Sequence, residues 1–115
     1  MKTLSGYTFC VPDCFEASIT QRNFQPGDTL YDTPDAYSEW GGALQRIGYA
    51  IQVDSATPGL AGRVTFTILR PNDQRTALVR LTSASGTQDS FIALLRSGDI
   101  QSILDGHSIS KLANA

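Results

Sequence analysis

The side chains that most often perform catalysis are few in this chain and stand far apart. His107 is the single histidine, and Cys10 and Cys14 are the only two cysteines. Ser108 follows His107, but adjacent side chains point apart, whereas a nucleophile must lie within hydrogen-bond reach of its base. Two thiols and one distant imidazole also make a poor metal site. We therefore predict no catalytic residue, no metal site and no cofactor.

Four carboxylates, those of Asp28, Asp32, Asp35 and Glu39, gather in one short segment. Paired acids could serve a glycosidase or hold a cation. However, the segment lacks the glycine and terminal glutamate of a calcium loop, and aspartate is favoured among turn residues because its side chain bonds to nearby backbone. The nucleotide-binding patterns GxxxxGKS/T and GxGxxG are absent. We interpret these acids as turn residues. A small enzyme is kept as an alternative, behind a structural protein and a protein-interaction module.

A different group of residues could bind phosphate and base edges without performing a reaction. Guanidinium and hydroxyl groups are good partners for both, and a broad sheet can hold RNA in this way. The predicted strands place such side chains on one face, with no carboxylate before Asp54 at the rim. The predicted RNA-binding residues are Arg46, Gln52, Arg63, Thr65, Thr67 and Arg80. The alternative is an ordinary solvated face, since threonine and arginine tolerate strands.

Three alternating segments must position those residues. Residues 45–54, 62–70 and 76–84 alternate apolar and polar side chains, and turns with Pro58, Gly59 and Pro71 separate them. Such alternation is typical of a sheet with one buried and one exposed face, so we predict an antiparallel meander. The predicted core face carries Ile47, Tyr49, Ile51, Val53, Val64, Phe66, Ile68, Ala77, Val79 and Leu81.

The N-terminal part is predicted to add a β-hairpin over residues 6–20, which brings the sheet to about five strands. Pro12 and Asp13 would form its turn. Residues 21–44 are predicted to be irregular, because turn residues interrupt them repeatedly. For Trp40 in that segment, packing on the core is favoured over a binding role.

The hydrophobic period changes to that of a helix near the C-terminus. Thr87 is a suitable N-cap for a helix over residues 88–97, which Gly98 would end. Asp99 can cap a second helix, so that residues 99–105 form it and Gly106 stops it. The tail at 107–115 is predicted to be extended or mobile. The sequence thus predicts one α+β domain, residues 1–115, with a hairpin, an antiparallel sheet and two short helices.

These helices are short for the sheet they would cover. Soluble monomers avoid large exposed apolar faces, so we predict a homodimer in which the helices of each subunit pack on the partner's sheet. The predicted interface residues are Phe91, Leu94, Leu95, Ile100, Ile103 and Leu104. In the alternative, the hairpin and residues 21–44 fold over the sheet and complete a monomer.

Composition sets further limits. The net charge is −2, and 17% of the residues are charged, below the roughly 25% of an ordinary domain, which fits a surface buried in an assembly. No apolar run would span a membrane or serve as a signal peptide. We therefore expect a cytoplasmic protein with no membrane partner and no small-molecule substrate. Cys10 and Cys14 could be bridged across a hairpin, but free thiols are favoured in a reducing cytosol.

Three stretches, taken in order, support a resemblance. They are AYSEW at 36–40, before the first long strand; GRVTFTILRP at 62–71, a strand that ends in proline; and TQDSFIALLRSGDIQSILDG at 87–106, the two closing helices. In these stretches and in the order of its elements, the chain resembles the coat proteins of single-stranded RNA bacteriophages. The resemblance covers most of the chain. The chain differs in its shorter helices, its less basic strand face and its lack of a C-terminal tyrosine.

The resemblance implies a five-stranded sheet, helices that clasp a partner subunit, and an RNA hairpin bound on the inner sheet face to repress translation. Thr65 and Thr67 match two RNA-contacting positions, although the family often has lysine where Thr67 stands. It further implies a structural capsid protein that assembles through dimers into a virus-like particle around genomic RNA. Such a protein resides in the virion after synthesis in the host cytoplasm. The competing hypothesis is a small cytoplasmic protein-interaction module, such as an inhibitor, immunity or phage accessory protein.

Overall fold

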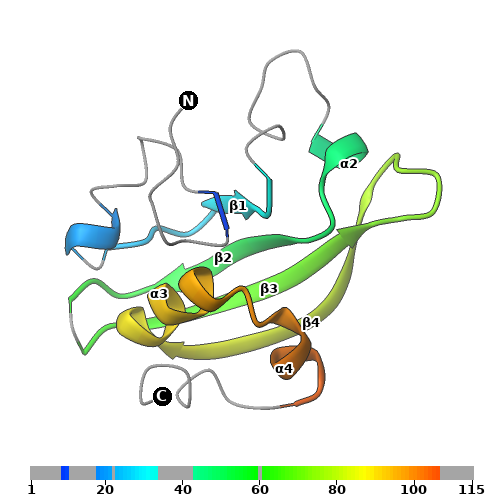
Figure 1. Ribbon diagram of the computed structural model, residues 1–115. Coiled ribbons are helices and arrows are strands. Elements are labelled where there is room, and N and C mark those ends of the chain that lie inside the picture. The colour runs from blue at the N-terminus through cyan, green and yellow to red at the C-terminus, as the bar shows by residue number, and fades with distance from the viewer. Residues whose placement is uncertain (1–8, 11–17, 22, 34–42, 60, 107–115) are drawn as a thin grey trace.

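The fold is α+β, with one antiparallel sheet of four strands and short helices (Figure 1). The computed structural model describes residues 9–10, 18–21, 23–33, 43–59 and 61–106. The strands are β1 (Thr29–Tyr31), β2 (Ala50–Ala56), β3 (Arg63–Pro71) and β4 (Leu78–Thr87). They lie side by side in chain order, and each pairs antiparallel with its neighbour. The predicted meander is therefore confirmed for β2, β3 and β4.

The start of the first long strand was predicted wrongly. Residues 45–54 were expected to be extended, but Ala43–Arg46 form the short helix α2, and β2 begins at Ala50. The Asp32 carboxylate accepts hydrogen bonds from the backbone N–H groups of Gly48 and Tyr49, at 3.0 and 2.9 Å. These bonds hold the segment between α2 and β2 in a turn, so the polar pattern around residue 46 does not belong to the sheet.

Two bulges interrupt the ladders. Between β2 and β3 the pairing passes from Val53 to Ser55, so Asp54 is an extra residue. Between β3 and β4 the partners of Ile68 and Leu69 are Thr82 and Arg80, so Leu81 is an extra residue on β4. Because side chains alternate along a strand, an extra residue exchanges the faces beyond it. Both bulges therefore decide which side chains reach each surface of the sheet.

The two C-terminal helices match the prediction closely. Helix α3 (Gln88–Ser97) begins after Thr87, whose hydroxyl accepts from the Ser90 N–H at 3.0 Å. It ends at Gly98, which has a φ of 65°, a left-handed conformation that favours glycine. Helix α4 (Ile100–Leu104) follows, with the Asp99 carboxylate accepting from the Ser102 N–H at 3.1 Å. The predicted caps are thus confirmed.

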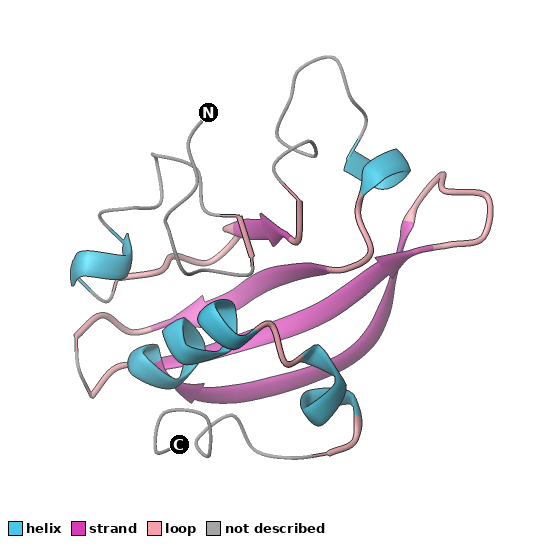
Figure 2. Cartoon of the chain, viewed as in Figure 1, coloured by secondary structure: helices cyan, strands magenta, loops and turns pink. Residues whose placement is uncertain are grey.

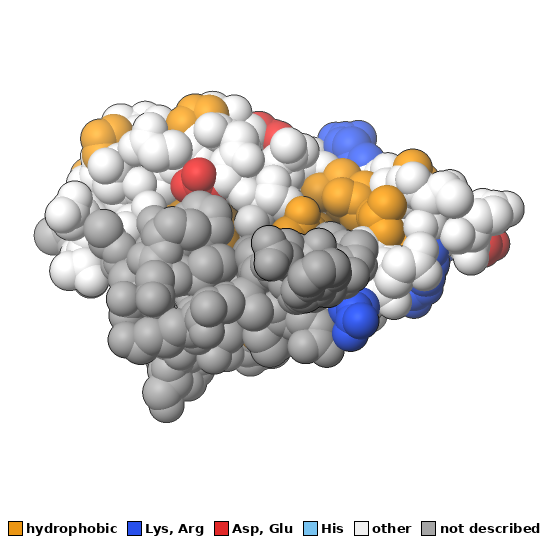
Figure 3. All heavy atoms as spheres, turned by 90° about the horizontal axis from the view of Figure 1, so that it is seen from above, with side chains coloured by type: hydrophobic (Ala, Val, Ile, Leu, Met, Phe, Trp, Pro, Cys, Tyr) orange, Lys and Arg blue, Asp and Glu red, His pale blue; other side chains and the backbone are white. Residues whose placement is uncertain are grey.

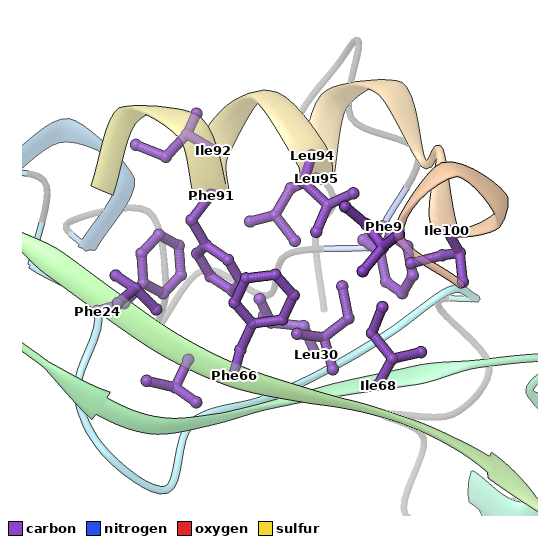
Figure 4. Packing of buried hydrophobic residues seen from close by; sticks show 14 of the residues in the cluster. Phe9, Phe24, Leu30, Phe66, Ile68, Phe91, Ile92, Leu94, Leu95 and Ile100 are labelled. Atoms are coloured by element: carbon purple, nitrogen blue, oxygen red, sulfur yellow. The ribbon is translucent and has the colours of Figure 1, made fainter. Parts of the chain in front are cut away.

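The hydrophobic core lies between the sheet and α3, which crosses in front of the strands (Figure 2). Val64, Phe66 and Ile68 alternate along β3, and all three are fully buried. The ring centroids of Phe66 and Phe91 are 5.1 Å apart, a contact that joins β3 to α3 (Figure 4). The ring of Phe24 is nearly perpendicular to that of Phe91, and the two ring centroids are 5.0 Å apart. Aromatic pairs in this geometry add to the stabilisation from burial alone.

Segments before the sheet complete the cover of this face. Phe9, Ile19, Phe24 and Leu30 all join the core with α3. These side chains come from the predicted hairpin and from residues 21–44, the segments that the alternative prediction folds over the sheet. Much of the predicted 6–20 hairpin lies outside the described residues, as does the Pro12–Asp13 turn. Its last residues, 18–20, form a helical turn and not a strand, and the 21–44 segment contains β1.

The side chains predicted for the dimer interface serve the chain's own core. Five of them are buried within the single chain, and Leu104 packs against the same core while partly exposed. They pack in the core of the same subunit, and their packing on a partner's sheet stays a prediction. The buried five are Phe91, Leu94, Leu95, Ile100 and Ile103.

One polar side chain, that of Gln88, is fully buried beside this core. Its Oε1 accepts from the Phe24 N–H at 3.3 Å, and its Nε2 donates to the Thr57 carbonyl at 3.1 Å. The turn between β2 and β3, which contains Thr57, packs so closely that a Cβ on Gly62 would lie 1.9 Å from the Thr57 carbonyl oxygen. Gln88 thus joins α3 to the segment that precedes β1 and to the β2–β3 turn.

A second, smaller core lies at the β3–β4 hairpin end of the sheet. Ile47 and Ala50 are buried there, and Tyr31, Leu69 and Leu78 pack on them. Arg75, which has a positive φ of 54°, donates from Nη1 to the carbonyls of Leu44 and Ile47 at 3.0 and 3.1 Å. This arginine ties the hairpin loop to α2. Seen from above, hydrophobic side chains gather on this half of the molecule, beside basic ones (Figure 3).

Candidate nucleic-acid interface

The side of the sheet away from α3 carries a polar surface, which we call the open face. Register identifies its members, because Gln52, Thr67 and Ser83 are directly paired across β2, β3 and β4. Ser55, Thr65 and Ser85 form the next row. Gln52, Ser55, Ser83 and Ser85 are exposed, and Thr65 is half-buried. Figure 1 views the sheet from the α3 side, so the open face is its far side.

Hydrogen bonds link the side chains of the open face across the strands. Thr67 Oγ1 donates to Asp54 Oδ2 at 2.6 Å and lies 3.0 Å from Ser83 Oγ. Arg80 donates to the same Ser83 oxygen from Nε and Nη2, at 3.2 and 2.9 Å. The row of hydroxyls is therefore connected to a cation at one end and to an anion at the other.

The chemistry of these groups fixes the direction of the bonds. An ionised carboxylate only accepts, so the Thr67 hydroxyl proton points to Asp54. Ser83 must then donate its own proton to Thr67, while its oxygen accepts from Arg80. Each hydroxyl proton in the chain Arg80–Ser83–Thr67–Asp54 is committed. New bonds on this part of the face are open mainly to the outer carboxylate oxygen of Asp54 and to the remaining guanidinium N–H groups of Arg80.

Two arginines lie on the open face. Arg63 donates to Ser85 Oγ at 3.3 Å near the start of β3, and Arg80 lies toward the opposite end of the sheet. Both side chains are exposed. Among the residues that the structure describes, each guanidinium bonds to a serine hydroxyl and to no carboxylate. Guanidinium groups held in this way suit phosphate oxygens.

The predicted set of binding residues is only partly brought together. Gln52, Arg63, Thr65, Thr67 and Arg80 share the open face, as expected. Thr67, however, is 7% exposed, and its hydroxyl is already bonded on both sides. Arg46 is wrongly placed in the prediction, because it lies in α2 and not on a strand.

The neighbouring residues of β3 and β4 do not extend the polar surface toward the β3–β4 hairpin. The Leu81 bulge turns Thr82 toward the core side, opposite Ile68. Leu69 and Leu78 do face this side, but they belong to the small core under Ile47 and are partly buried. On the side predicted to be core, Val79 is exposed, at 38%. The polar surface is therefore confined to the part of the sheet away from the β3–β4 hairpin.

Sequence reasoning missed Asp54, Ser55, Ser83 and Ser85. The prediction placed Asp54 at the rim, yet its bulge position brings the carboxylate beside Thr67 on the face itself. The run SASGT at 83–87 alternates hydroxyl and small residues. That alternation was the available signal for a strand extending to Thr87 with serines on one side.

Metal-ligating side chains do not gather among the described residues. No group of three His, Cys, Asp or Glu side chains that could hold a metal ion occurs among them. Within the same part of the chain, no helix is long and apolar enough to cross a membrane. Cys10 is buried and pairs through its backbone with Tyr31, whereas Cys14, Tyr37, Trp40 and His107 lie outside the described residues.

Comparison with known protein families, with curated proteins and with solved structures found no match.

Proposed function

We propose that this protein is a coat-type structural subunit that binds single-stranded RNA on the open face of its sheet. The observation that carries the proposal is the open face itself. Hydroxyl and amide groups line it across three strands, Arg63 and Arg80 stand at opposite ends, and the side chains other than Thr65 and Thr67 are exposed. RNA is commonly recognised where unpaired bases and phosphates can lie on such a surface.

The division of labour on this face follows from its chemistry. Arg63 and Arg80 attract phosphates and determine most of the salt dependence of binding. Gln52 and Thr65 supply shorter contacts that orient the strand, because polar groups at base edges specify sequence while phosphate contacts position the RNA. Arg46 lies outside the sheet face, so we assign it no role in orienting RNA.

The order of elements supports the coat-protein part of the proposal. An antiparallel meander is followed directly by two capped helices that pack on the sheet, the order on which the resemblance rests. A fifth strand, RNA repression of translation and residence in the virion belong to this proposal as well. The competing interaction-module hypothesis is addressed by the same experiments.

Assembly through dimers would use the free edge of β4. Within the part of the chain described, β4 is an edge strand of ten residues, Leu78–Thr87, with no other strand on its outer side. It contains no proline or lysine, which edge strands use to avoid pairing, and one charge, Arg80. An antiparallel copy would extend the sheet by two-fold symmetry and place both open faces on one side. This arrangement leaves α3 on its own sheet.

The RNA test compares charge removal on and off the open face. Filter binding of single-stranded RNA is measured across a salt series for wild type, for Arg63→Ala with Arg80→Ala, and for the control Arg70→Ala. Arg70 carries the same charge and lies on β3, as Arg63 does. Its side chain is on the other side of the sheet, opposite Val79. The double variant should lose affinity, and its salt slope should fall by about 1.4, or roughly 0.7 for each phosphate contact in a single strand. Equal binding by the double variant and wild type would refute the proposal.

The assembly test uses sedimentation and electron microscopy of the expressed protein. We expect closed particles that contain host RNA, together with a dimer under dissociating conditions. Val79→Asp, which puts a second charge on the β4 edge, should weaken the dimer, whereas Val79→Thr should not. A stable monomer at micromolar concentration that binds no RNA would favour the interaction module instead.

A further inference from the structure

The carboxylate of Asp54 is out of place on a surface that binds phosphate. It belongs to β2 and is exposed, and the other residues described on the open face are neutral or basic. A negative charge repels the RNA backbone, so no phosphate can settle against it. The bulge at this residue nevertheless turns the side chain onto the open face, beside Thr67.

From this placement we propose that Asp54 is a base-reading residue, which accepts a hydrogen bond from the amino group of an unpaired base. The inference rests on the proposed RNA-binding function and adds its specificity. The face would prefer cytosine, adenine and guanine, which carry exocyclic amino groups, over uracil, which carries none. Acidic side chains accept from the cytosine amino group in known modes of base readout.

The hydrogen-bond chain leaves Asp54 ready for such a contact. Thr67 bonds to Oδ2 and holds the carboxylate in one orientation, and no described residue donates to Oδ1. Because the protons of Thr67 and Ser83 are already committed, these hydroxyls do not compete as donors to a base carbonyl. The free capacity of Asp54 is therefore an acceptor, which an exocyclic amino group fills. The one donor of uracil, N3–H, lies between two carbonyl oxygens that the carboxylate repels, so uracil fits this acceptor less well.

The two ends of this hydrogen-bond chain suit different parts of a nucleotide, the phosphate at one end and the base at the other. Its cationic end, Arg80, retains guanidinium N–H groups beyond the two that bond Ser83, and Asp54 stands at its anionic end. The two ends lie on β4 and β2, two strand spacings or about 10 Å apart across the sheet. A nucleotide that places phosphate at Arg80 and its base at Asp54 satisfies both ends.

The test measures binding of short oligo(C), oligo(A) and oligo(U) to the protein by fluorescence anisotropy at one salt concentration. Wild type should bind oligo(C) and oligo(A) at least about five-fold more tightly than oligo(U), the lower end for one good base contact. Asp54→Asn should bind oligo(U) more tightly than wild type, and its preference should shrink to within about two-fold, because an amide no longer repels the uracil carbonyls.

Asp73→Asn is the matched control. Asp73 lies in the exposed β3–β4 turn, so this change removes the same charge away from the open face and should leave the base preference intact. Equal binding of the three oligomers by wild type, with the dependence on Arg63 and Arg80 preserved, would overturn the role of Asp54 and leave RNA binding standing. Absence of salt-dependent binding to every oligomer would overturn the proposed function itself. The wild-type comparison decides the matter even if the Asp54 variant folds poorly.

Discussion

Strand β3 has two surfaces that follow different physics. On one side Val64, Phe66 and Ile68 are fully buried beneath α3. On the other, Thr65 and Thr67 bond to side chains of the neighbouring strands. Alternate residues of β3 thus serve two purposes: those on the helix side stabilise the fold, and those on the open face form the polar surface. Changes on the helix side should affect unfolding, and changes on the open face should affect binding with little effect on unfolding.

Each side of the sheet has one residue that departs from this division. Gln88 is a fully buried polar side chain on the helix side, where it bonds to two backbone groups. Thr67 is a nearly buried residue on the open face. Substituting these two residues tests whether burial or the choice of face determines the energetic cost.

The largest effect is expected at Phe66. Phe66→Ala removes a ring that contacts Phe91 and leaves a cavity between β3 and α3, so the free energy of unfolding should fall by about 3–5 kcal/mol. Urea denaturation followed by circular dichroism measures it. The control is Ser85→Ala on the exposed open face, which should change the unfolding free energy by no more than about 0.5 kcal/mol. Similar losses in both variants would contradict the division between faces.

An intermediate effect is expected at Gln88. Gln88→Ala leaves the N–H of the fully buried Phe24 without its acceptor, which should cost about 1–3 kcal/mol of unfolding free energy. The Thr57 carbonyl loses its bond to Gln88 Nε2 as well, in a residue that is itself exposed.

Gln52→Ala provides the matched comparison, because it removes the same side chain from the open face. Its expected effect is within about 0.5 kcal/mol, measured by the same urea titration. If Gln88→Ala also changed the unfolding free energy by no more than about 0.5 kcal/mol, the buried glutamine would contribute nothing to holding α3 against the segment that precedes β1.

The smallest effect is expected at Thr67. Thr67→Val keeps the volume and removes the hydroxyl, but its partners Asp54 and Ser83 are exposed and can bond to water. The unfolding free energy should therefore change by less than about 1 kcal/mol. A loss above 2 kcal/mol in chemical denaturation would mean that the hydroxyl chain holds the strands together and does not merely order the surface.

Much of the sheet and both closing helices could be predicted from local pattern. The alternation of Val64, Phe66 and Ile68 gave β3 and its core face, and the capping residues Thr87 and Asp99 gave the helix starts. These features depend on neighbours in sequence, which composition and period report directly.

The remainder depended on contacts between distant residues. Asp32 bonds to Gly48 and Tyr49 and thereby delays the start of β2, although nothing near residue 46 signals this. The cover supplied by Phe9 and Phe24 also comes from chain segments far from the helices they join. Half of the open face was found because it follows strand alternation, and Asp54 and the serines were missed because bulges break that alternation.

The bulge at Leu81 makes β4 sensitive to the number of its residues as well as to their identity. Removal of Leu81 itself would bring together Arg80 and Thr82, which already lie on opposite faces, so the ladder would become regular and the other side chains would keep their faces. Removal of Ala84 would instead turn Ser83 toward the aromatic core and Thr82 toward the open face. The strand can therefore lose a residue at the bulge at little cost, but not beside it. Over evolutionary time the length of the strand beyond Leu81 should be held more tightly than the residues at its exposed positions.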